Sequence, residues 1–267
     1  MISINGYPIG NKCYPNNERI FEKPIISGIF PTDEFTIEFK YGTDIDISIL
    51  IMTKKYLDDM YNNPKVTLRM KYAPYSRMDR YIEGYMFSLK YFCKMINDLN
   101  FHKVIVLDPH SNMTTALLDR SCEINIDQYL DKVFEQVKKI DYIFYPDKGA
   151  NLKYRNTLKT RRQSFCGDKK RNLNTGKIIN YELVDCPDIK DKTILIIDDL
   201  CAYGGTFQLA SEKLKEKGAD KIYLYISHCE DSIYQGKMIN SGLIDKIFTT
   251  DSILTDWSSS LICNISN

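Results

Sequence analysis

Short apolar runs alternate with amphipathic stretches along most of the chain. The runs that predict strands are Ile47–Met52, Val66–Tyr72, Lys103–Leu107, Tyr142–Tyr145, Thr193–Ile197, Lys221–Ile226 and Lys246–Thr249. The stretches that predict helices are Lys54–Tyr61, Met86–Leu99, Asn112–Leu118, Tyr129–Lys138, Gly205–Lys217 and Ser232–Asn240. Continuous apolar strands separated by helices are typical of mostly parallel sheets covered by helices on both faces, so we expect an α/β fold.

Two parts of this pattern indicate the domain organisation. Alternation in Phe35-Thr-Ile-Glu-Phe39 predicts an antiparallel hairpin within Ile25–Lys40. Further along, two apolar strands each end in acidic residues, at Asp108 and at Asp198-Asp199. This duplication predicts two similar α/β domains in tandem, residues 1–130 and residues 131–267.

Composition excludes several classes of protein. The length of 267 residues suits one large or two small domains, and a net charge of +1 gives no general affinity for nucleic acid or anionic membranes. No apolar run has the length of a transmembrane helix, and the first six residues are not a signal peptide. The 8 cysteines include no C-x-x-C pair and predict reduced thiols in a cytoplasmic protein, while 3 histidines make a structural zinc site unexpected.

The segment from Thr193 to Phe207 carries the clearest chemical signal. Four apolar residues lead to Asp198 and Asp199, and Gly204-Gly205-Thr206 then opens a helical pattern. Glycines let the backbone approach a phosphate, the helix N-terminus attracts it, and the carboxylates can accept hydrogen bonds from sugar hydroxyls. We therefore interpret this loop as a site for a phosphorylated ribose.

Other proteins also place an acidic pair after an apolar strand, notably receiver domains and Walker B segments. A P-loop is not supported, because its nearest match, Asn174-Thr-Gly-Lys-Ile178, lacks the first glycine and the hydroxyl residue. The polar segment Asn151–Gly176 is rich in lysine and arginine and precedes the ribose-phosphate loop. A mobile catalytic flap could occupy this position.

Four further strings precede the Asp198–Thr206 loop in the chain. They are Tyr75-Ser-Arg77-Met78-Asp79-Arg80, Val106-Leu-Asp108-Pro-His110-Ser, Pro146-Asp147-Lys-Gly149-Ala150 and Gly167-Asp-Lys169-Lys-Arg171-Asn. In this order, the five strings resemble motifs of the ribose-phosphate pyrophosphokinases, also called PRPP synthetases. The resemblance covers most of the chain. It implies two phosphoribosyltransferase-like domains, with the ATP-side motifs in the first and the ribose-phosphate loop and flap in the second.

This family moves the β,γ-diphosphate of ATP to the anomeric hydroxyl of ribose 5-phosphate and releases AMP, with Mg²⁺. The resemblance implies that His110 and Asp147 hold the metal and that Arg77 and Asp79 bind ATP. The structural alternatives are that His110 caps a helix beginning at Ser111 and that Arg77 forms a surface ion pair with Asp79. Met78 replaces a glutamine of the family, which removes one polar contact to the nucleotide.

The resemblance also implies roles in the second domain. Lys169 and Arg171 would close over the diphosphate, although the sequence does not decide between Lys169 and Lys170. Asp198 and Asp199 would bind the ribose hydroxyls and take part in catalysis. The 5-phosphate would bind at Ala202, Tyr203, Gly204, Gly205 and Thr206.

The family further implies a homo-oligomer in which adenine contacts a hairpin from the neighbouring subunit. Phe30 and Asp33, in the string Phe30-Pro-Thr-Asp33-Glu34, correspond to that hairpin. The ATP site would then lie at a dimer interface. The resemblance also implies an N-terminal helix, shortened here to Ile4–Asn17.

The 5-phosphate loop departs from the family pattern at two positions. Ala202 replaces a carboxylate and Tyr203 replaces a small hydroxyl residue. The pocket is thereby enlarged and gains a ring on which a base could stack. Both changes suit an acceptor whose 5-phosphate carries a further group, such as ADP-ribose. The Asp-Pro-His-Ser string resembles a phage-encoded branch of the family, some of whose members act on ADP-ribose.

The sequence leaves several alternatives open. Ribose 5-phosphate remains the other acceptor, with Tyr203 packed against the flap, and the product would serve nucleotide synthesis rather than NAD metabolism. A phosphoribosyltransferase that consumes PRPP would need no ATP motif, so the strings around Arg77 and His110 disfavour it. A non-catalytic regulatory subunit is disfavoured by Asp147, Lys169, Arg171 and the Asp198–Asp199 pair.

Overall fold

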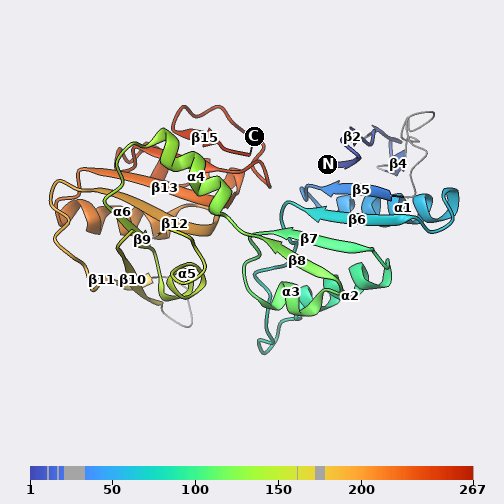
Figure 1. Ribbon diagram of the computed structural model, residues 1–267, viewed down its shortest axis with the longest axis horizontal. Helices are drawn as coiled ribbons and strands as arrows, with labels where there is room; N and C mark the ends of the chain where they lie inside the picture. The colour runs from blue at the N-terminus through green and yellow to red at the C-terminus, as the bar shows by residue number, and fades with distance from the viewer. Residues whose placement is uncertain (11, 17, 21–33, 161, 172–177, 267) are drawn as a thin grey trace. The chain divides into compact units, whose positions relative to one another are not determined.

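The chain divides into two compact units, Met1–Ile124 and Asn125–Asn267 (Figure 1). A computed structural model describes residues 1–10, 12–16, 18–20, 34–160, 162–171 and 178–266. The division that we expected near residue 130 falls within α4 (Asp127–Gln136), which belongs to the second unit. Each unit is built around one main sheet, and the two units are described separately.

The first unit contains a six-stranded sheet of order β2-β1-β5-β6-β7-β8. Its strands are β1 (Ile2–Ile4), β2 (Tyr7–Pro8), β5 (Glu34–Phe39), β6 (Lys65–Met70), β7 (Lys103–Leu107) and β8 (Ser121–Ile124). Strands β5 to β8 are parallel, whereas β1 is antiparallel to both β2 and β5. A separate antiparallel pair joins β3 (Lys12–Cys13) to β4 (Arg19–Ile20).

The expected N-terminal helix over Ile4–Asn17 is wrong. Ile2 and Ile4 are buried on one face of β1, and the chain then reverses at Asn5-Gly6 into β2. Both turn residues have positive φ, 49° and 84°, as an Asn-Gly hairpin turn requires. The hairpin expected within Ile25–Lys40 is described only from residue 34, where β5 is antiparallel to β1 but parallel to β6.

The predicted strand Ile47–Met52 is also wrong, because these residues lie inside helix α1 (Asp44–Met60). The carboxylate of Asp46 accepts hydrogen bonds from the backbone N–H groups of Gly42 and Thr43, at 2.8 and 3.0 Å, which fixes the helix start. The apolar run suggested a strand, but buried positions recur at helical spacing, at Ile47, Leu50 and Leu57.

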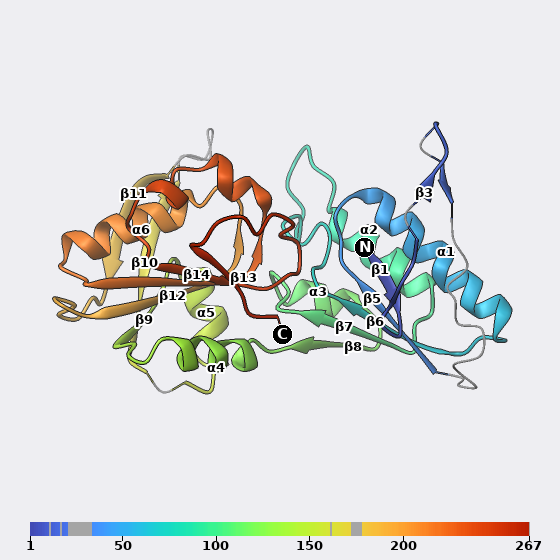
Figure 2. The same ribbon diagram turned by 90° about the horizontal axis from the view of Figure 1, so that it is seen from above.

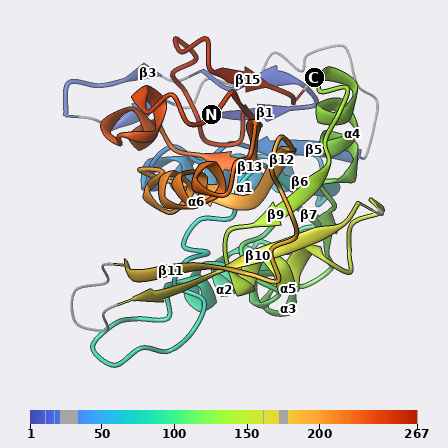
Figure 3. The ribbon, with the colours of Figure 1, turned by 90° about the vertical axis from the view of Figure 1, so that its left-hand side faces the viewer.

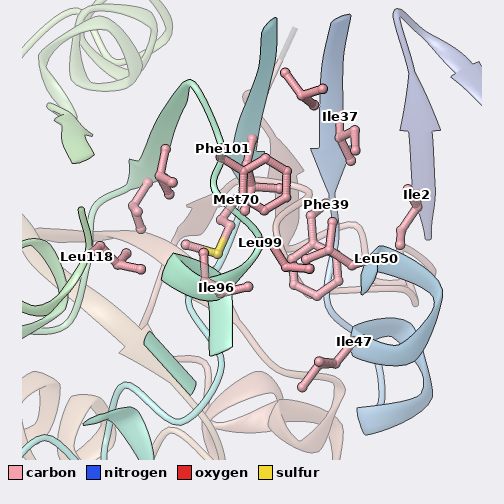
Figure 4. Close-up of a cluster of buried hydrophobic side chains, with 14 of the residues drawn as sticks. Ile2, Ile37, Phe39, Ile47, Leu50, Met70, Ile96, Leu99, Phe101 and Leu118 are labelled. Carbon is pink, nitrogen blue, oxygen red and sulfur yellow. The ribbon is translucent and has the colours of Figure 1, made fainter. Parts of the chain in front are cut away.

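Helices α1 and α2 (Ser88–Asp98) pack on the same face of the first sheet (Figures 2 and 4). They cover alternate strand residues such as Phe39 and Met70, which are fully buried. The strand order β5-β6-β7-β8 advances steadily, and successive right-handed crossovers in one direction bring helices to one face. The predicted parallel α/β architecture is therefore present, and in the first unit these two helices cover one face of the sheet.

The second unit contains a seven-stranded sheet of order β11-β10-β9-β12-β13-β14-β15. The strands are β9 (Tyr142–Tyr145), β10 (Ser164–Arg171), β11 (Ile178–Val184), β12 (Thr193–Cys201), β13 (Lys221–Cys229), β14 (Lys246–Thr249) and β15 (Ile262–Asn264). Only the β10–β11 pair is antiparallel, and it forms a long hairpin (Figure 3).

Helices cover both faces of this second sheet. Helix α6 (Gly205–Glu216) packs on one face through Phe207, Ala210 and Leu214. Helices α4 and α5 (Lys148–Tyr154) pack on the other, against residues such as Tyr145 and Leu195. The helices lie on different faces because the two crossovers run in opposite directions along the strand order. The connection from β9 leads to β10 at one edge, whereas the connection from β12 leads to β13 toward the other edge.

The predicted helix Ser232–Asn240 is replaced by two 3₁₀ turns, η1 (Asp231–Gln235) and η2 (Met238–Asn240). Gly236 lies between them, and a Cβ at this glycine would stand 1.9 Å from the carbonyl oxygen of Tyr203. This close approach brings the chain after β13 against the loop that precedes α6.

Helix α3 (Met113–Leu117) is a further helix of the first unit.

Candidate active site

Asp147 occupies the turn between β9 and α5 in the second unit. It is the N-cap of α5, and its Oδ1 accepts a hydrogen bond from the backbone N–H of Ala150 at 2.9 Å. Burial alone would raise the pKa of Asp147. The hydrogen bond and charge of Lys169, with the N–H groups of Ala150 and Gly149, outweigh burial and lower that pKa. Asp147 is therefore a carboxylate at neutral pH.

Lys169 comes from β10, which runs parallel beside β9. Its Nζ forms an ion pair with Oδ2 of Asp147, and the two side chains are only 22% and 21% exposed. Lys148 and Asp168 form a second ion pair at 2.6 Å between the same two segments. The segment expected to be a mobile flap thus includes an ordered strand, and the backbone of Arg171 lies at its end.

Asp198 and Asp199 lie within β12, which continues past the predicted end at Ile197 to Cys201. Burial, followed by the negative charges of Asp199 and Asp147, raises the pKa of Asp198 well above its ordinary value. The N–H of Asp199 donates to Oδ1 of Asp198 at 2.9 Å. The structure therefore brings Asp147 and Asp198 into electrostatic contact, and this contact favours the protonated form of Asp198.

The loop from Ala202 to Thr206 leads from β12 into α6. Gly204 is the N-cap of the helix with φ of 77°, and a Cβ there would stand 2.9 Å from the side chain of Met238. This position therefore favours glycine on both backbone and steric grounds. Gly205 begins the helix, Thr206 is half-buried, and Tyr203 is 59% exposed. The first-turn N–H groups of a helix lack intrahelical partners and can bind an anion.

The first unit carries the residues expected to bind ATP. Asp79 is 6% exposed, and its Oδ1 lies 3.0 Å from Nε of Arg80. Burial would raise its pKa, but Ser111, Arg80 and the nearby His110 lower it overall. Asp79 and His110, from the segments after β6 and β7, are thus brought together. Arg77 is exposed.

Two structural alternatives for these residues can now be assessed. Helix α3 begins at Met113 with Asn112 as its N-cap, so His110 is not the capping residue. The ion pair that Asp79 forms at 3.0 Å is with Arg80, its neighbour in the sequence. Phe30 and Asp33 lie outside the described residues.

Among the described residues, no three His, Cys, Asp or Glu side chains gather as a set that could hold a metal ion. His110 belongs to the first unit and Asp147 to the second. Mg²⁺ commonly binds through one or two protein carboxylates and fills its other positions with water and substrate oxygens.

The motifs in the sequence did not identify Tyr181 as a residue of this site. The hydroxyl of Tyr181, in β11, donates a hydrogen bond to the carbonyl oxygen of Pro146 at 2.9 Å. The β10–β11 hairpin was not predicted, because the charged run Asp168–Arg171 obscured its first strand. The stretch Tyr181–Val184 carried a β signal in its tyrosine, leucine and valine.

Comparison with curated proteins gives matches along almost the whole chain. Ribose-phosphate pyrophosphokinase of Sulfurisphaera tokodaii is 26% identical, covering 100% of this chain and 91% of the relative. The enzyme of the same name from Sulfolobus acidocaldarius is 28% identical, covering 97% of this chain and 89% of the relative. The chain is thus similar in sequence to proteins named ribose-phosphate pyrophosphokinase. No protein-family model matches it.

The fold agrees with that of a solved ribose-phosphate pyrophosphokinase. Phosphoribosylpyrophosphate synthetase from Mycobacterium smegmatis superposes with a TM-score of 0.74 over 97% of this chain and 87% of that one, at 16% identity. The predicted tandem α/β fold is confirmed. In the described part of the chain, no helix has the length and hydrophobicity needed to cross a membrane.

Proposed function

We propose that the chain is a Mg²⁺-dependent diphosphotransferase. It moves the β,γ-diphosphate of ATP to the anomeric hydroxyl of a ribose 5-phosphate moiety and releases AMP. The observation that carries this proposal is the Asp147–Lys169 ion pair, which lies in electrostatic contact with Asp198 of a ribose-phosphate type loop. The relatives named ribose-phosphate pyrophosphokinase support the same reaction.

The ribose end of the acceptor would bind at β12 and α6. Asp198 and Asp199 accept hydrogen bonds from the 2- and 3-hydroxyls. Because the pKa of Asp198 is raised, this pair can hold one proton and both donate and accept. The N–H groups of Gly205 and Thr206, at the start of α6, hold the 5-phosphate.

The moving diphosphate requires positive charge. In the reaction, the anomeric oxygen forms a bond to the β-phosphorus, the bond from that phosphorus to the α,β-bridging oxygen breaks, and the hydroxyl proton is lost. Lys169 and Arg171 would neutralise the charge on the transferred group, as cationic clamps do in other phosphoryl transfers. Lys169 is already fixed beside the acidic residues.

Asp147 fits the requirements of a Mg²⁺ ligand. It is a hard oxygen donor, its lowered pKa keeps it charged, and it already binds a cation in the ammonium of Lys169. The imidazole of His110 is a poorer partner for Mg²⁺, so we propose that His110 acts through a bound water. When bound, Mg²⁺ would neutralise phosphate oxygens of ATP.

In the first unit, Arg77 and Asp79 would bind ATP, because a guanidinium can contact phosphate oxygens or stack on adenine. We further propose a homo-oligomer in which residues 30–34 of a neighbouring subunit contact the adenine. Sedimentation of the purified chain with and without MgATP tests this oligomer.

For the acceptor, we favour ADP-ribose slightly over ribose 5-phosphate. Ala202 leaves room beside the 5-phosphate position, and Tyr203 offers an exposed ring on which a base can stack. Ribose 5-phosphate, giving PRPP, is the alternative, and it is the acceptor implied by the names of the relatives.

The test is AMP release from MgATP, with ribose 5-phosphate and ADP-ribose supplied in separate reactions. AMP only with ADP-ribose supports the enlarged pocket, and AMP with ribose 5-phosphate supports a PRPP synthetase. AMP with neither acceptor contradicts the proposal and favours a regulatory homologue or a PRPP-consuming phosphoribosyltransferase. Lys169→Met serves as the matched inactive control.

A further inference from the structure

Tyr181 lies directly opposite Lys169 in the β10–β11 hairpin. Directly opposed residues of an antiparallel pair project from the same face, so the two side chains are neighbours. The Tyr181 side chain is buried, at 6% exposed, and its hydroxyl donates to the carbonyl oxygen of Pro146 at 2.9 Å. Pro146 immediately precedes Asp147, the ion-pair partner of Lys169.

Gly167 shows how closely these segments meet. A Cβ at this glycine would stand 2.3 Å from the Tyr181 hydroxyl and 2.8 Å from the Pro146 oxygen. The absence of a side chain at Gly167 therefore leaves the space in which the hydrogen bond forms. Three segments, β10, β11 and the turn after β9, converge at this bond.

The surroundings fix the hydroxyl in its donor role. Burial, and after it the negative charge of Asp147, raises the pKa of Tyr181 above its ordinary value. The phenol therefore remains protonated and donates its hydrogen bond to the oxygen of Pro146. Its available contribution is to hold the carbonyl of Pro146.

We propose that Tyr181 is a positioning residue of the diphosphate-transfer site, whose hydroxyl ties the hairpin to Pro146 and thereby holds Lys169 in place opposite Asp147. This inference rests on the proposed function. The ring of Tyr181 has a separate structural role, because it packs in the apolar cluster with Phe144 and Phe165. A test must therefore remove the hydroxyl and keep the ring.

The test compares Tyr181→Phe with Tyr142→Phe. Tyr142 packs against the same cluster, with its ring 6.2 Å from that of Phe165, and lies outside the convergence at Pro146. We expect Tyr181→Phe to lower kcat by about tenfold with KM for the acceptor changed by less than about twofold, because misplacement of a charged group affects the transition state most. Tyr142→Phe should change both by less than about twofold.

Hydrogen–deuterium exchange supplies a readout that needs no activity. Tyr181→Phe should speed exchange in residues 146–150 and 164–171, whereas Tyr142→Phe should not. An inactive wild type would refute the proposed function while the exchange comparison still tested the hydrogen bond. An active wild type with equal kcat and exchange in the two variants would overturn the positioning role. A rise in KM with unchanged kcat would overturn it too.

Discussion

The ammonium of Lys169 forms an ion pair with the carboxylate of Asp147. The group proposed to bind the diphosphate and the group proposed to bind Mg²⁺ therefore neutralise each other in the free chain. A divalent cation that binds Asp147 would displace the ammonium of Lys169. A diphosphate that binds Lys169 would displace the carboxylate of Asp147. The cost of separating the pair is then offset by two new charge pairs. Binding of metal and of diphosphate should therefore be coupled.

Replacement of Lys169 separates the two roles. Lys169→Met should lower kcat by about 10²-fold or more, because one cation is lost from the transition state. The same change should strengthen Mg²⁺ binding at Asp147, since the competing ammonium is gone, and titration calorimetry with MgCl₂ would measure this. The control is Lys148→Met, which breaks the more exposed pair with Asp168 and should leave kcat within a few-fold. Weaker Mg²⁺ binding in Lys169→Met would contradict the competition.

Gly204 and Gly205 offer a matched pair for testing the phosphate loop. Gly204→Ala should lower the free energy of unfolding by about 1–2 kcal/mol, because φ is 77° and the new methyl group would meet Met238. Gly205→Ala should change it by less than about 1 kcal/mol, because nothing lies within 4 Å of that Cβ position. Urea denaturation of both variants measures the difference, and equal effects would show that the loop conformation does not depend on Gly204.

Local chemistry explains which parts of this structure could be predicted. The glycine–helix sequence around Gly204 is specified by neighbouring residues, so the start of α6 at Gly205 was predicted correctly, although β12 extends further than predicted. Within the run Ile47–Met52 the apolar residues alone do not separate a buried strand from a buried helix. The adjacent capping residues Thr43 and Asp46, which the strand prediction did not use, favour the helix. Tyr181 acquires its contact with Pro146 through pairing of distant strands, which no spacing of residues in one segment reveals.

A buried ion pair in α1 gives a stability prediction in the first unit. Nζ of Lys54 lies 2.6 Å from Oδ2 of Asp58, and Lys54 is 3% exposed with its charge 5.6 Å from the ring of Phe101. Asp58→Ala should lower the free energy of unfolding by about 3 kcal/mol, because a buried ammonium loses its partner. Chemical denaturation measures this loss.

The control for this pair is Lys65→Ala. Lys65 and Glu34 form a pair at 3.0 Å whose side chains are 60% and 70% exposed. Its removal should cost less than about 1 kcal/mol. Similar losses of unfolding free energy in Asp58→Ala and Lys65→Ala would show that burial does not determine how much the Lys54–Asp58 pair contributes to stability.

Asp44 accepts hydrogen bonds from two tyrosines, which predicts a stability change at high pH. Tyr75 donates at 2.6 Å and Tyr41 at 2.7 Å. The bond to Asp44, with burial, raises the pKa of Tyr75 to about 12. The stabilisation is complete below the ordinary tyrosine pKa near 10 and is lost as pH rises through the folded value.

Asp44→Asn should lower the pKa of Tyr75 and reduce the loss of unfolding free energy between about pH 10 and pH 12. Titration of phenolate absorbance follows the hydroxyl, and denaturation at several pH values follows stability. Asp59→Asn, at an exposed position of the same helix, should leave both curves unchanged. If Asp44→Asn leaves the phenolate titration unaltered, the hydrogen bond does not control Tyr75.

The proposed acceptor preference should depend on Ala202 and Tyr203, the two positions that we expect to enlarge the 5-phosphate site. Restoring a carboxylate and a small hydroxyl residue, in Ala202→Asp/Tyr203→Thr, narrows the pocket and removes the exposed ring. We expect kcat/KM for ADP-ribose to fall by about tenfold or more relative to that for ribose 5-phosphate, because a lost stacking contact costs about 1 kcal/mol or more and a new carboxylate repels the second phosphate.

The separate variants apportion this effect, since Tyr203→Thr removes only the ring and Ala202→Asp adds only the charge. Tyr223→Thr controls for loss of a tyrosine elsewhere in the second unit, because it lies in β13 away from the loop. An unchanged ratio in the double variant, with activity retained on ribose 5-phosphate, would mean that these two positions do not select the acceptor. The exposed Tyr203 ring would then have no part in substrate binding, and ribose 5-phosphate would become the favoured acceptor.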